Sequence, residues 1–364
     1  MIKYFFAFLL LVHGSIHTIG FSKAFGIGNI QQLKKEISRK SGLIWLSTAI
    51  LFFVAAVTYL LKIECWWMFG LIATIISQIL ITVNWQDAKF GTISNLIILP
   101  AVLIGYFSWN FKNSFHQDVD ANLINSIMET KMITDADLNA IPEAVKRYLK
   151  YTNVINKPIV RNFKVIFSGE MRGKDQKWFH FKSEQYNFTD VPTRLFFMKA
   201  TMKSLPFAGY HKFVDGNASM TIKMFSQFPI VDLKQNELNQ AETVTYFNDM
   251  CLLAPGSLID KRIKWVESDS LSATAIFTNN GISITAKLLF NPMGQLINFI
   301  SDDRYEVTGG KPQKLRFSTP VKGYKNVDGR NVISLGEAVW HYPEGLFVYG
   351  KFNLENIEYN LSNQ

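Results

Sequence analysis

Long apolar runs fill the first third of this sequence and are almost absent from the rest. Four of them contain no Asp, Glu, Lys or Arg, and they cover residues 4–21, 42–61, 66–83 and 90–109. Each is close to the roughly 20 residues that a helix needs to cross the hydrocarbon core of a membrane. Aromatic residues typical of the membrane–water interface lie at the expected ends: Trp66, Trp67, Trp85, Tyr106 and Trp109. The pattern predicts a four-span helical bundle in residues 1–112.

The first run has an alternative interpretation as a cleaved signal peptide. A signal peptide has a basic start, a shorter apolar core and a cleavage site of small residues. Lys3 is the only charged residue before this run, and no site of the A-x-A type follows it. We therefore expect a retained membrane span.

The connection between the first two runs is basic. It carries five Lys or Arg residues and one acid, namely Lys23, Lys34, Lys35, Arg39, Lys40 and Glu36. Positive loops remain on the cytoplasmic side, where they attract anionic lipid headgroups. With four crossings, the sequence predicts a multi-pass protein of the cell membrane whose termini and C-terminal domain are extracytoplasmic.

The hydrophobic pattern changes after residue 112. Residues 113–157 are expected to form a polar linker and a short helix, with a cap at Thr134 and Asp137. In residues 158–364, segments such as RNFKVIFSG, NASMTIKMF and GISITAKLLF alternate apolar and polar side chains, which is typical of strands with one buried face. One helical segment interrupts them at about residues 235–253. The sequence predicts an α+β domain with a large antiparallel sheet and one or two packed helices.

Several separated motifs resemble a family of bacterial proteins labelled as a domain of unknown function. They are NWQDAKFGTISNLIIL, IPEAVKRYLKY, RFSTPVKGYKNVDGRNVISLGEAVWHYPEG and the closing IEYN. The resemblance covers nearly the whole chain and implies a multi-span membrane protein with a C-terminal β-rich domain, but no activity and no catalytic residue. The late strands around VDGRNV and the ending NIEYN are also similar to the half-barrel of periplasmic lipoprotein carriers. That likeness is an analogy of pattern, implies a curved sheet, and does not extend to the multi-span anchor.

Net charge and cysteine content exclude several classes of protein. The chain of 364 residues has a formal charge of +9, which could indicate nucleic-acid binding. However, residues 1–112 hold nine Lys or Arg and three acids, which leaves 29 basic and 26 acidic residues in the rest. Because the excess belongs largely to the apolar part, we expect no nucleic-acid partner. Two cysteines exclude a disulfide-dense scaffold and a multi-cysteine zinc site.

His13 and His17 lie inside the first predicted span, four residues apart and so on one helical face. An ionisable residue inside a span is a functional candidate. Gly14, Ser15 and Gly20 beside them favour close helix packing with polar side chains that bond across the interface. A functional polar cavity and a metal or haem site are the alternatives. No other His, Cys or carboxylate lies within a span, so we expect no metal and no cofactor.

No established catalytic motif is present, whether a nucleophile elbow, a P-loop, a dinucleotide fingerprint or H-E-x-x-H. Asp302 and Asp303 are adjacent, so on a strand they would point to opposite faces. His180 and His211 could pair across strands as a base, but no Ser or Cys stands in a recognisable arrangement with them. We therefore predict no catalytic residue. An acid and a histidine that meet in one pocket would favour an enzyme.

Residues 194–228 are unusually dense in Met and Phe. The alternation groups the candidate ligand-binding residues on strand faces: Phe196, Met198 and Met202, and then Met220, Ile222 and Met224. Met-rich surfaces suit varied apolar partners, although ordinary core filling is the simplest explanation and a protein interface is the third. The sequence favours a membrane-anchored module that binds an apolar or lipid-like ligand or a cell-envelope protein. The alternative is a membrane enzyme that acts on a lipid-like substrate.

Overall fold

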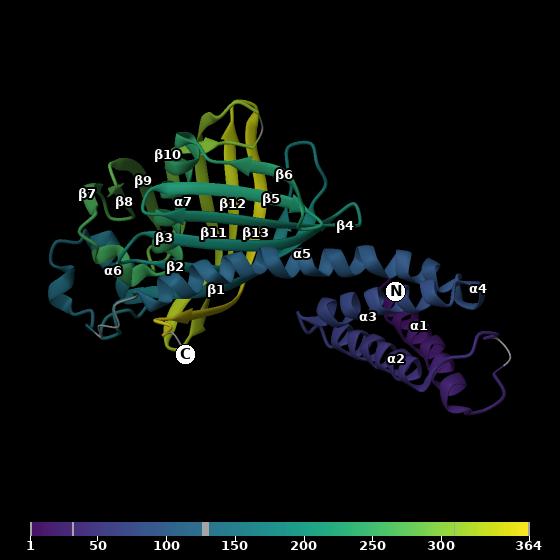
Figure 1. Ribbon diagram of the computed structural model, residues 1–364. Helices are drawn as coiled ribbons and strands as arrows, with labels where there is room; N and C mark the ends of the chain where they lie inside the picture. The colour runs from purple at the N-terminus through teal and green to yellow at the C-terminus, as the bar shows by residue number, and fades with distance from the viewer. Residues whose placement is uncertain (1, 31–32, 126–130, 309, 363–364) are drawn as a thin grey trace. The chain divides into compact units, whose positions relative to one another are not determined.

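A computed structural model describes residues 2–30, 33–125, 131–308 and 310–362 (Figure 1). The chain divides into two units, Met1–Asn113 and Ser114–Gln364. Each unit has its own hydrophobic core.

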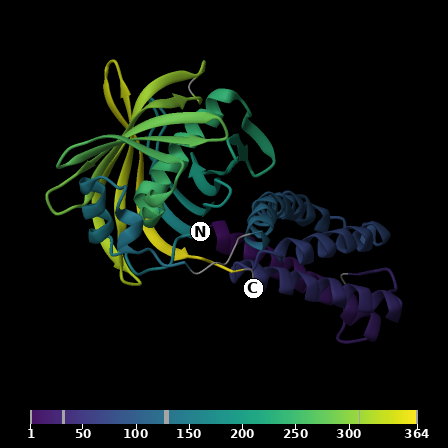
Figure 2. The same ribbon diagram turned by 90° about the vertical axis from the view of Figure 1, so that its left-hand side faces the viewer.

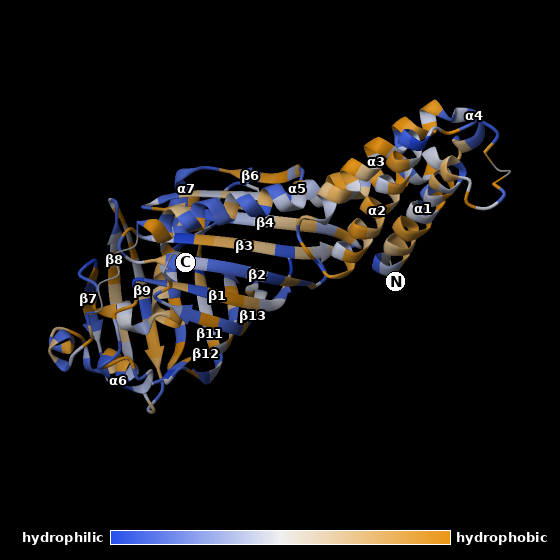
Figure 3. Ribbon diagram, turned by 60° about the horizontal axis from the view of Figure 1, so that its bottom comes forward, coloured by the Kyte–Doolittle hydropathy of each residue, from blue (hydrophilic) through white to orange (hydrophobic). Residues whose placement is uncertain are grey.

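The first unit is helical. Its elements are α1 (Ile2–Phe25), α2 (Arg39–Leu60), α3 (Trp66–Val83), the short α4 (Trp85–Ala88) and the first part of α5 (Gly91–Ile124). Four of these helices, α1, α2, α3 and α5, are long and apolar enough to cross a membrane, which confirms the four helices predicted from the sequence. Figure 3 shows hydrophobic residues concentrated along α1, α2 and α3.

Small residues let α1 and α2 pack closely. A side chain at Gly20 would overlap the indole of Trp45, and one at Gly42 would overlap Ala24. Close backbone approach of this kind is the usual basis of helix association in a membrane. The interface between these helices therefore depends on glycine at both positions.

Helix α5 is longer than the sequence predicted. It continues past the expected end at Trp109 to Ile124, through a stretch that was expected to be linker. The cause is an apolar stripe at helical spacing, in which Phe111, Phe115 and Val119 are all buried. Residues 126–130 of the expected linker lie outside the described residues.

The second unit is built on a sheet of thirteen antiparallel strands in the order β6-β5-β4-β3-β2-β1-β13-β12-β11-β10-β9-β8-β7. The first group consists of β1 (Asn162–Met171), β2 (Phe179–Phe188), β3 (Thr193–Met202), β4 (Leu205–Val214), β5 (Asn217–Met224) and β6 (Phe228–Leu233). The second group consists of β7 (Ile263–Ser268), β8 (Ser272–Asn279), β9 (Ile282–Phe290), β10 (Leu296–Glu306), β11 (Gln313–Val327), β12 (Arg330–Tyr342) and β13 (Gly345–Tyr359). Within each group consecutive strands pair with one another, β6 and β7 form the two edges of the sheet, and β13 returns to lie beside β1.

The sheet curls into a half-barrel around a helix (Figure 2). This helix, α7 (Asn236–Leu253), joins the two groups of strands and packs against β4, β5, β9, β10 and β12. The remaining helices are η1 (Asp135–Leu138), α6 (Glu143–Tyr151) and η2 (Pro255–Ile259). The curved α+β architecture predicted from the sequence is confirmed.

Local sequence signals explain where these elements begin and end. The expected cap before η1 is present, because the Thr134 amide donates a hydrogen bond of 2.8 Å to the Asp137 carboxylate. The β4–β5 turn has Asp215 and Gly216 at φ of 46° and 81°, and Asp328 and Gly329 between β11 and β12 have 50° and 75°. Tight hairpins favour Asp-Gly because two successive residues need positive φ.

The convex side of β2, β3 and β4 is covered by the part of α5 that belongs to the second unit. The ring of Phe115 lies 5.5 Å from the rings of both Phe197 and Tyr210. Asp118 accepts hydrogen bonds from Tyr210 at 2.7 Å and from Lys212 at 2.6 Å. The first part of β3, residues 193–198, is therefore buried on both faces, whereas residues 199–202 are exposed or half-buried.

Candidate functional site

A cavity of about 160 Å³ lies between the concave face of the sheet and α7. Strands β1 to β4 and β10 to β13 form its wall on one side, and α7 forms the other. The apolar part of the wall includes Phe167, Phe196, Leu252, Phe317, Ile333 and Phe352. Pockets for small molecules usually measure about 300–1,000 Å³, so this cavity fits a ring or a short acyl chain.

One end of the cavity is polar because Arg194 reaches from β3 to two acids of α7. Its Nε donates to Asp249 at 2.8 Å, and its Nη1 donates to Glu242 at 3.1 Å. Nη2 donates to Gln185 of β2 at 3.1 Å. Since a buried charge is costly unless it is paired and hydrogen-bonded, this cluster fixes α7 over the sheet.

The two acids differ in how readily they take up a proton. Burial alone would raise the pKa of Glu242, but attraction to Arg194 and to His211 outweighs burial and lowers it to about 2. At Asp249, burial raises the pKa in spite of the Arg194 guanidinium. Glu242 is therefore the firmly ionised partner of Arg194.

His211 and Glu242 meet in the cavity, with 3.8 Å between Nδ1 and a carboxylate oxygen. This is the acid–histidine contact that would favour an enzyme. In the described part of the chain, however, no Ser or Cys side chain is hydrogen-bonded to His211. His180 does not join it, because β3 separates their strands and the His180 side chain is 87% exposed beside Glu170.

Arg304 of β10 supplies a second guanidinium to the wall. Its central carbon lies 4.2 Å from the ring centre of Phe317 and 4.9 Å from that of Trp340. Its Nη1 donates a hydrogen bond of 2.7 Å to the hydroxyl of Tyr349. Cation–π contacts of this kind stabilise a partly desolvated guanidinium.

The neighbouring acids of Arg304 take no part in the cavity. Asp302 binds Arg316 at 2.7 Å and Asp303 binds Lys314 at 2.7 Å, so both are surface ion pairs. The β10–β11 register shifts between Ser301 and Arg304. Because this bulge adds one residue on β10, Arg304 faces inward where simple alternation would point it outward.

The Met- and Phe-rich strands share one face, as the sequence predicted. Phe196 pairs with His211 and His211 with Met220, while Met198 pairs with Gly209 and Gly209 with Ile222. Of the six candidates, Phe196 alone is among the residues that line this cavity. Met198 and Met220 are buried in the core, whereas Met202, Ile222 and Met224 are half-buried on the same strands. Their role in ligand binding stays a prediction.

The charged residues of this site were not identified from the sequence. Glu242 and Asp249 are seven residues apart on α7, two turns along one helical face, and this spacing was a usable signal. Arg194 directly precedes the apolar run LFFM, which was a second signal. No sequence signal pointed to Arg304, because its inward orientation depends on the bulge in β10.

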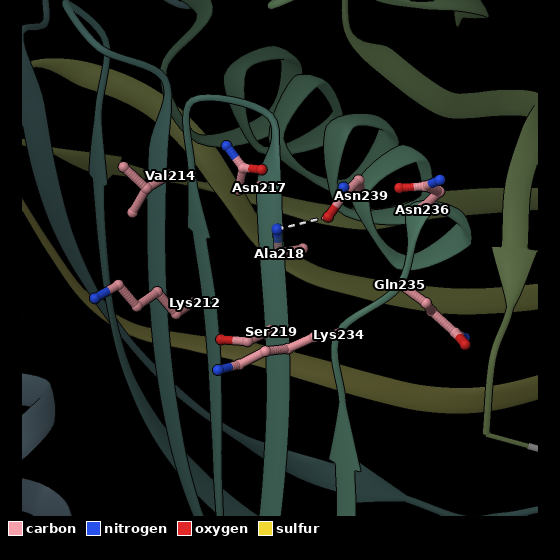
Figure 4. A pocket seen from close by; sticks show the side chains of 9 residues that line it. All are labelled: Lys212, Val214, Asn217, Ala218, Ser219, Lys234, Gln235, Asn236 and Asn239. Atoms are coloured by element: carbon pink, nitrogen blue, oxygen red, sulfur yellow. Dashed lines mark hydrogen bonds between the residues drawn. The ribbon is translucent and has the colours of Figure 1, made fainter.

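A second, polar pocket of about 370 Å³ lies at the start of α7 (Figure 4). Its lining includes Lys212, Ser219 and Lys234. The side-chain oxygen of Asn239 accepts a hydrogen bond of 2.7 Å from the Ala218 amide, which ties α7 to β5. Few of its lining residues are apolar, so this pocket does not suit an apolar ligand.

In the helical unit, His13 and His17 are both buried. Nε2 of His13 donates to the side-chain oxygen of Asn95 at 3.0 Å, and Nε2 of His17 lies 2.8 Å from the hydroxyl of Ser77. These bonds join α1, α3 and α5, as helix packing requires. A cavity of about 270 Å³ beside them is also lined by Asp87. The described residues contain no cluster of three or more His, Cys, Asp or Glu suited to a metal ion.

Comparisons with known proteins identify a family and several distant structures. Residues 131–352 match the sequence model of DUF6544, a family of unknown function. A LolA superfamily protein from Nitrosomonas europaea is 9% identical, with a TM-score of 0.34 over 60% of this chain and 94% of that chain. A DUF1329 family protein from Desulfovibrio piger is 10% identical, with a TM-score of 0.34 over 62% and 95%.

A third structure is described as an outer membrane lipoprotein-sorting protein domain from Vibrio parahaemolyticus. It is 8% identical, with a TM-score of 0.31 over 61% of this chain and 93% of that chain. No curated protein matches the chain at a significant level.

Proposed function

This chain belongs to the DUF6544 family, a family of unknown function, and we propose that its half-barrel binds an apolar or lipid-like ligand in the cavity beneath α7. The observation that carries the proposal is the cavity itself, about 160 Å³, whose wall combines aromatic and aliphatic side chains with the charged residues described above. Protein interiors are otherwise close-packed. An apolar cavity of about 150 Å³ is large enough to stay dry and bind a molecule the size of benzene.

The candidate residues on the same face fit a ligand longer than the cavity. Phe196 lies on the cavity wall. Met198, Met202, Met220, Ile222 and Met224 continue the concave face of β3 and β5 away from it. In this proposal a chain that enters beneath α7 extends along these flexible, polarisable side chains.

The setting we propose is a multi-pass protein of the cell membrane with a four-span domain (1–112), a connecting segment (113–157) and an extracytoplasmic β-rich domain (158–364). The four apolar helices support the membrane part. The bilayer would then be the source of the ligand, and an envelope protein would be a second partner of the exposed domain.

Photo-cross-linking of the full chain in phosphatidylcholine nanodiscs tests the proposal. The probe is an octanol that carries a diazirine at its tail, and the labelled peptides are identified by mass spectrometry. We expect adducts on α7 and on the strands that carry Phe317 and Phe352. Adducts confined to the membrane helices would refute the half-barrel as a binding site.

A matched pair of variants on β12 sharpens this test. Ala338 lines the cavity, whereas Leu335 of the same strand is exposed. Ala338→Phe fills the cavity at a cost of about 1–3 kcal/mol in the free energy of unfolding, and we expect it to abolish labelling of the half-barrel. Leu335→Phe should leave labelling unchanged. Equal labelling of the two variants would contradict the proposal.

A membrane enzyme that acts on a lipid-like substrate is the second candidate function. It is favoured by the contact between His211 and Glu242 in the cavity. Arg194 keeps Glu242 ionised, which makes that acid a weak proton donor or acceptor near neutral pH. Release of fatty acid from short-chain lipid esters by the full chain, and its loss in His211→Gln, would establish this alternative.

A further inference from the structure

Three buried polar atoms on the cavity wall have no hydrogen-bond partner among the residues that the structure describes. They are the side-chain oxygen of Asn248, Nε of Arg304 and the hydroxyl of Thr319. Asn248 and Thr319 are only 7% and 8% exposed. They come from α7, β10 and β11, so three separate elements of the cavity wall each carry an unsatisfied group. Buried polar groups are nearly always paired, which points to a polar partner inside the cavity.

Arg304 is the one arginine of the cavity wall that has no direct ion pair with a described residue. The three acids of the wall each contact a basic side chain: Glu242 and Asp249 contact Arg194, and Glu337 lies 3.4 Å from Lys322. Arg304 has no carboxylate within 4.0 Å in the described chain, and the hydroxyl of Tyr349 is its one hydrogen-bond partner there. At longer range the charge of Arg304 helps to lower the pKa of Glu242, but no described carboxylate neutralises it by direct contact.

The free edge of this guanidinium has the geometry that binds anions. Because Nη1 is engaged by Tyr349, the Nε–Nη2 edge has no acceptor among the described residues. Two parallel N–H groups on such an edge match the two oxygens of a carboxylate or phosphate. The rings of Phe317 and Trp340 pack on the Arg304 guanidinium and restrict its position. Little side-chain conformational freedom is therefore lost when a ligand binds.

We propose that Arg304, together with Thr319, binds the anionic head of a single-chain amphiphile whose apolar chain fills the cavity. The inference rests on the proposed function and adds the chemical class of the ligand: an acyl chain that ends in a carboxylate or a phosphate. The head accepts hydrogen bonds from the Nε–Nη2 edge and from the Thr319 hydroxyl. Asn248 binds a protonated head oxygen or a glycerol hydroxyl.

Calorimetric titration of the full chain in phosphatidylcholine nanodiscs tests this inference. Octanoate and 1-octanol share a chain length and differ in the charge of the head, and empty nanodiscs correct for partition into lipid. We expect octanoate to bind at least tenfold more tightly than octanol. Arg304→Gln should weaken octanoate by about 10- to 100-fold, as for loss of a charged hydrogen bond, and leave octanol unchanged.

The matched control is Arg316→Gln, which removes a positive charge from the neighbouring strand β11. Arg316 is an exposed residue paired with Asp302, so its loss should affect neither probe. Thr319→Val keeps the shape of the side chain and should weaken octanoate alone by a few fold. Retained octanol binding shows that each variant is folded. If Arg304→Gln does not fold, the effect of Thr319→Val on octanoate binding still tests the inference.

The outcomes separate the two proposals. If neither probe binds the half-barrel, the proposed function itself fails. If octanol binds as tightly as octanoate and Arg304→Gln changes neither, the ligand is apolar and the head-group inference is wrong. Octyl phosphate and inorganic phosphate distinguish the source of the anion: tight binding of inorganic phosphate without a chain would overturn the amphiphile in favour of a free anion.

Discussion

The buried ion cluster of Arg194, Glu242 and Asp249 leads to a prediction in which its two acids behave oppositely. Folding lowers the pKa of Glu242 from 4.5 to about 2. At about 1.4 kcal/mol for each pH unit, this corresponds to about 3 kcal/mol of stabilisation. Since the folded pKa is the lower one, the contribution is complete above pH 4.5 and is lost as the pH falls towards 2. Glu242→Gln should therefore cost about 3 kcal/mol at pH 7.

Asp249→Asn is the matched comparison. Burial raises the pKa of Asp249, so its ionised form opposes folding at neutral pH. An amide of the same size still accepts the hydrogen bond from Arg194, which keeps Glu242 as its counter-ion. We expect Asp249→Asn to cost much less than Glu242→Gln at pH 7.

A single thiol provides a local assay in the full chain. Cys251 is fully buried on α7, and replacing Cys65 by Ser leaves it as the only thiol. Its rate of modification by a disulfide reagent, divided by the rate in the unfolded chain, gives the free energy of opening around α7. A cost of 3 kcal/mol corresponds to modification on the order of 100-fold faster in Glu242→Gln.

Thermal unfolding between pH 7 and pH 2 supplies the second measurement. The difference between wild type and Glu242→Gln should shrink below about pH 4.5, the ordinary pKa of the carboxyl. A difference that stays constant down to pH 2 would refute the electrostatic reasoning. So would equal costs for the two acids, because the stabilisation would then come from packing rather than from charge.

Two further predictions concern the helical unit. A fluorescent protein that matures only in the cytoplasm, fused after Gln364, should remain dark in an inserted chain, because the basic loop is expected inside; a bright fusion would reverse the topology. Asn95→Ala removes the bond to His13 and the bonds to Ser77, so we expect a loss of about 1–2 kcal/mol in detergent unfolding. Thr82→Ala should cost less, because among the described residues the Thr82 hydroxyl bonds only to Gln78 of its own helix. An equal loss for the two variants would contradict a role for the network.

The helices and strands that the sequence predicted well are those that depend on the pattern of apolar and polar residues close together in the chain. The apolar runs predicted the four long helices because a run of about 20 apolar residues is typical of a helix that spans a membrane. Alternation gave strands such as β1, β5 and β9. Asp328 and Gly329 occupy the turn between β11 and β12 at positive φ, a conformation restricted to few residue types and so visible in local sequence.

The surroundings of α7 could not be predicted from its own sequence. The apolar residues of this helical segment that recur at helical spacing are buried, namely Leu238, Val244, Phe247 and Met250. A stripe predicts one buried face, yet the sheet curls far enough to enclose other faces of the helix, and this places Glu242 and Asp249 in the interior as well. How far a sheet curls depends on the pairing of all its strands, which local periodicity does not contain.

The alternation of side chains along a strand explains which site residues were predicted correctly and which were not. Strands β3, β4 and β5 pair without a bulge between them, so alternation correctly grouped Phe196 with Met198 and Met220 with Ile222. Alternation could not show where α7 leaves a gap above that face, and the cavity lies beside Phe196. On β10 one extra residue between Ser301 and Arg304 reverses which side chains face inward from that point on. The residue that we propose as the anion-binding group therefore follows two surface acids, in a position that a regular strand would expose to solvent.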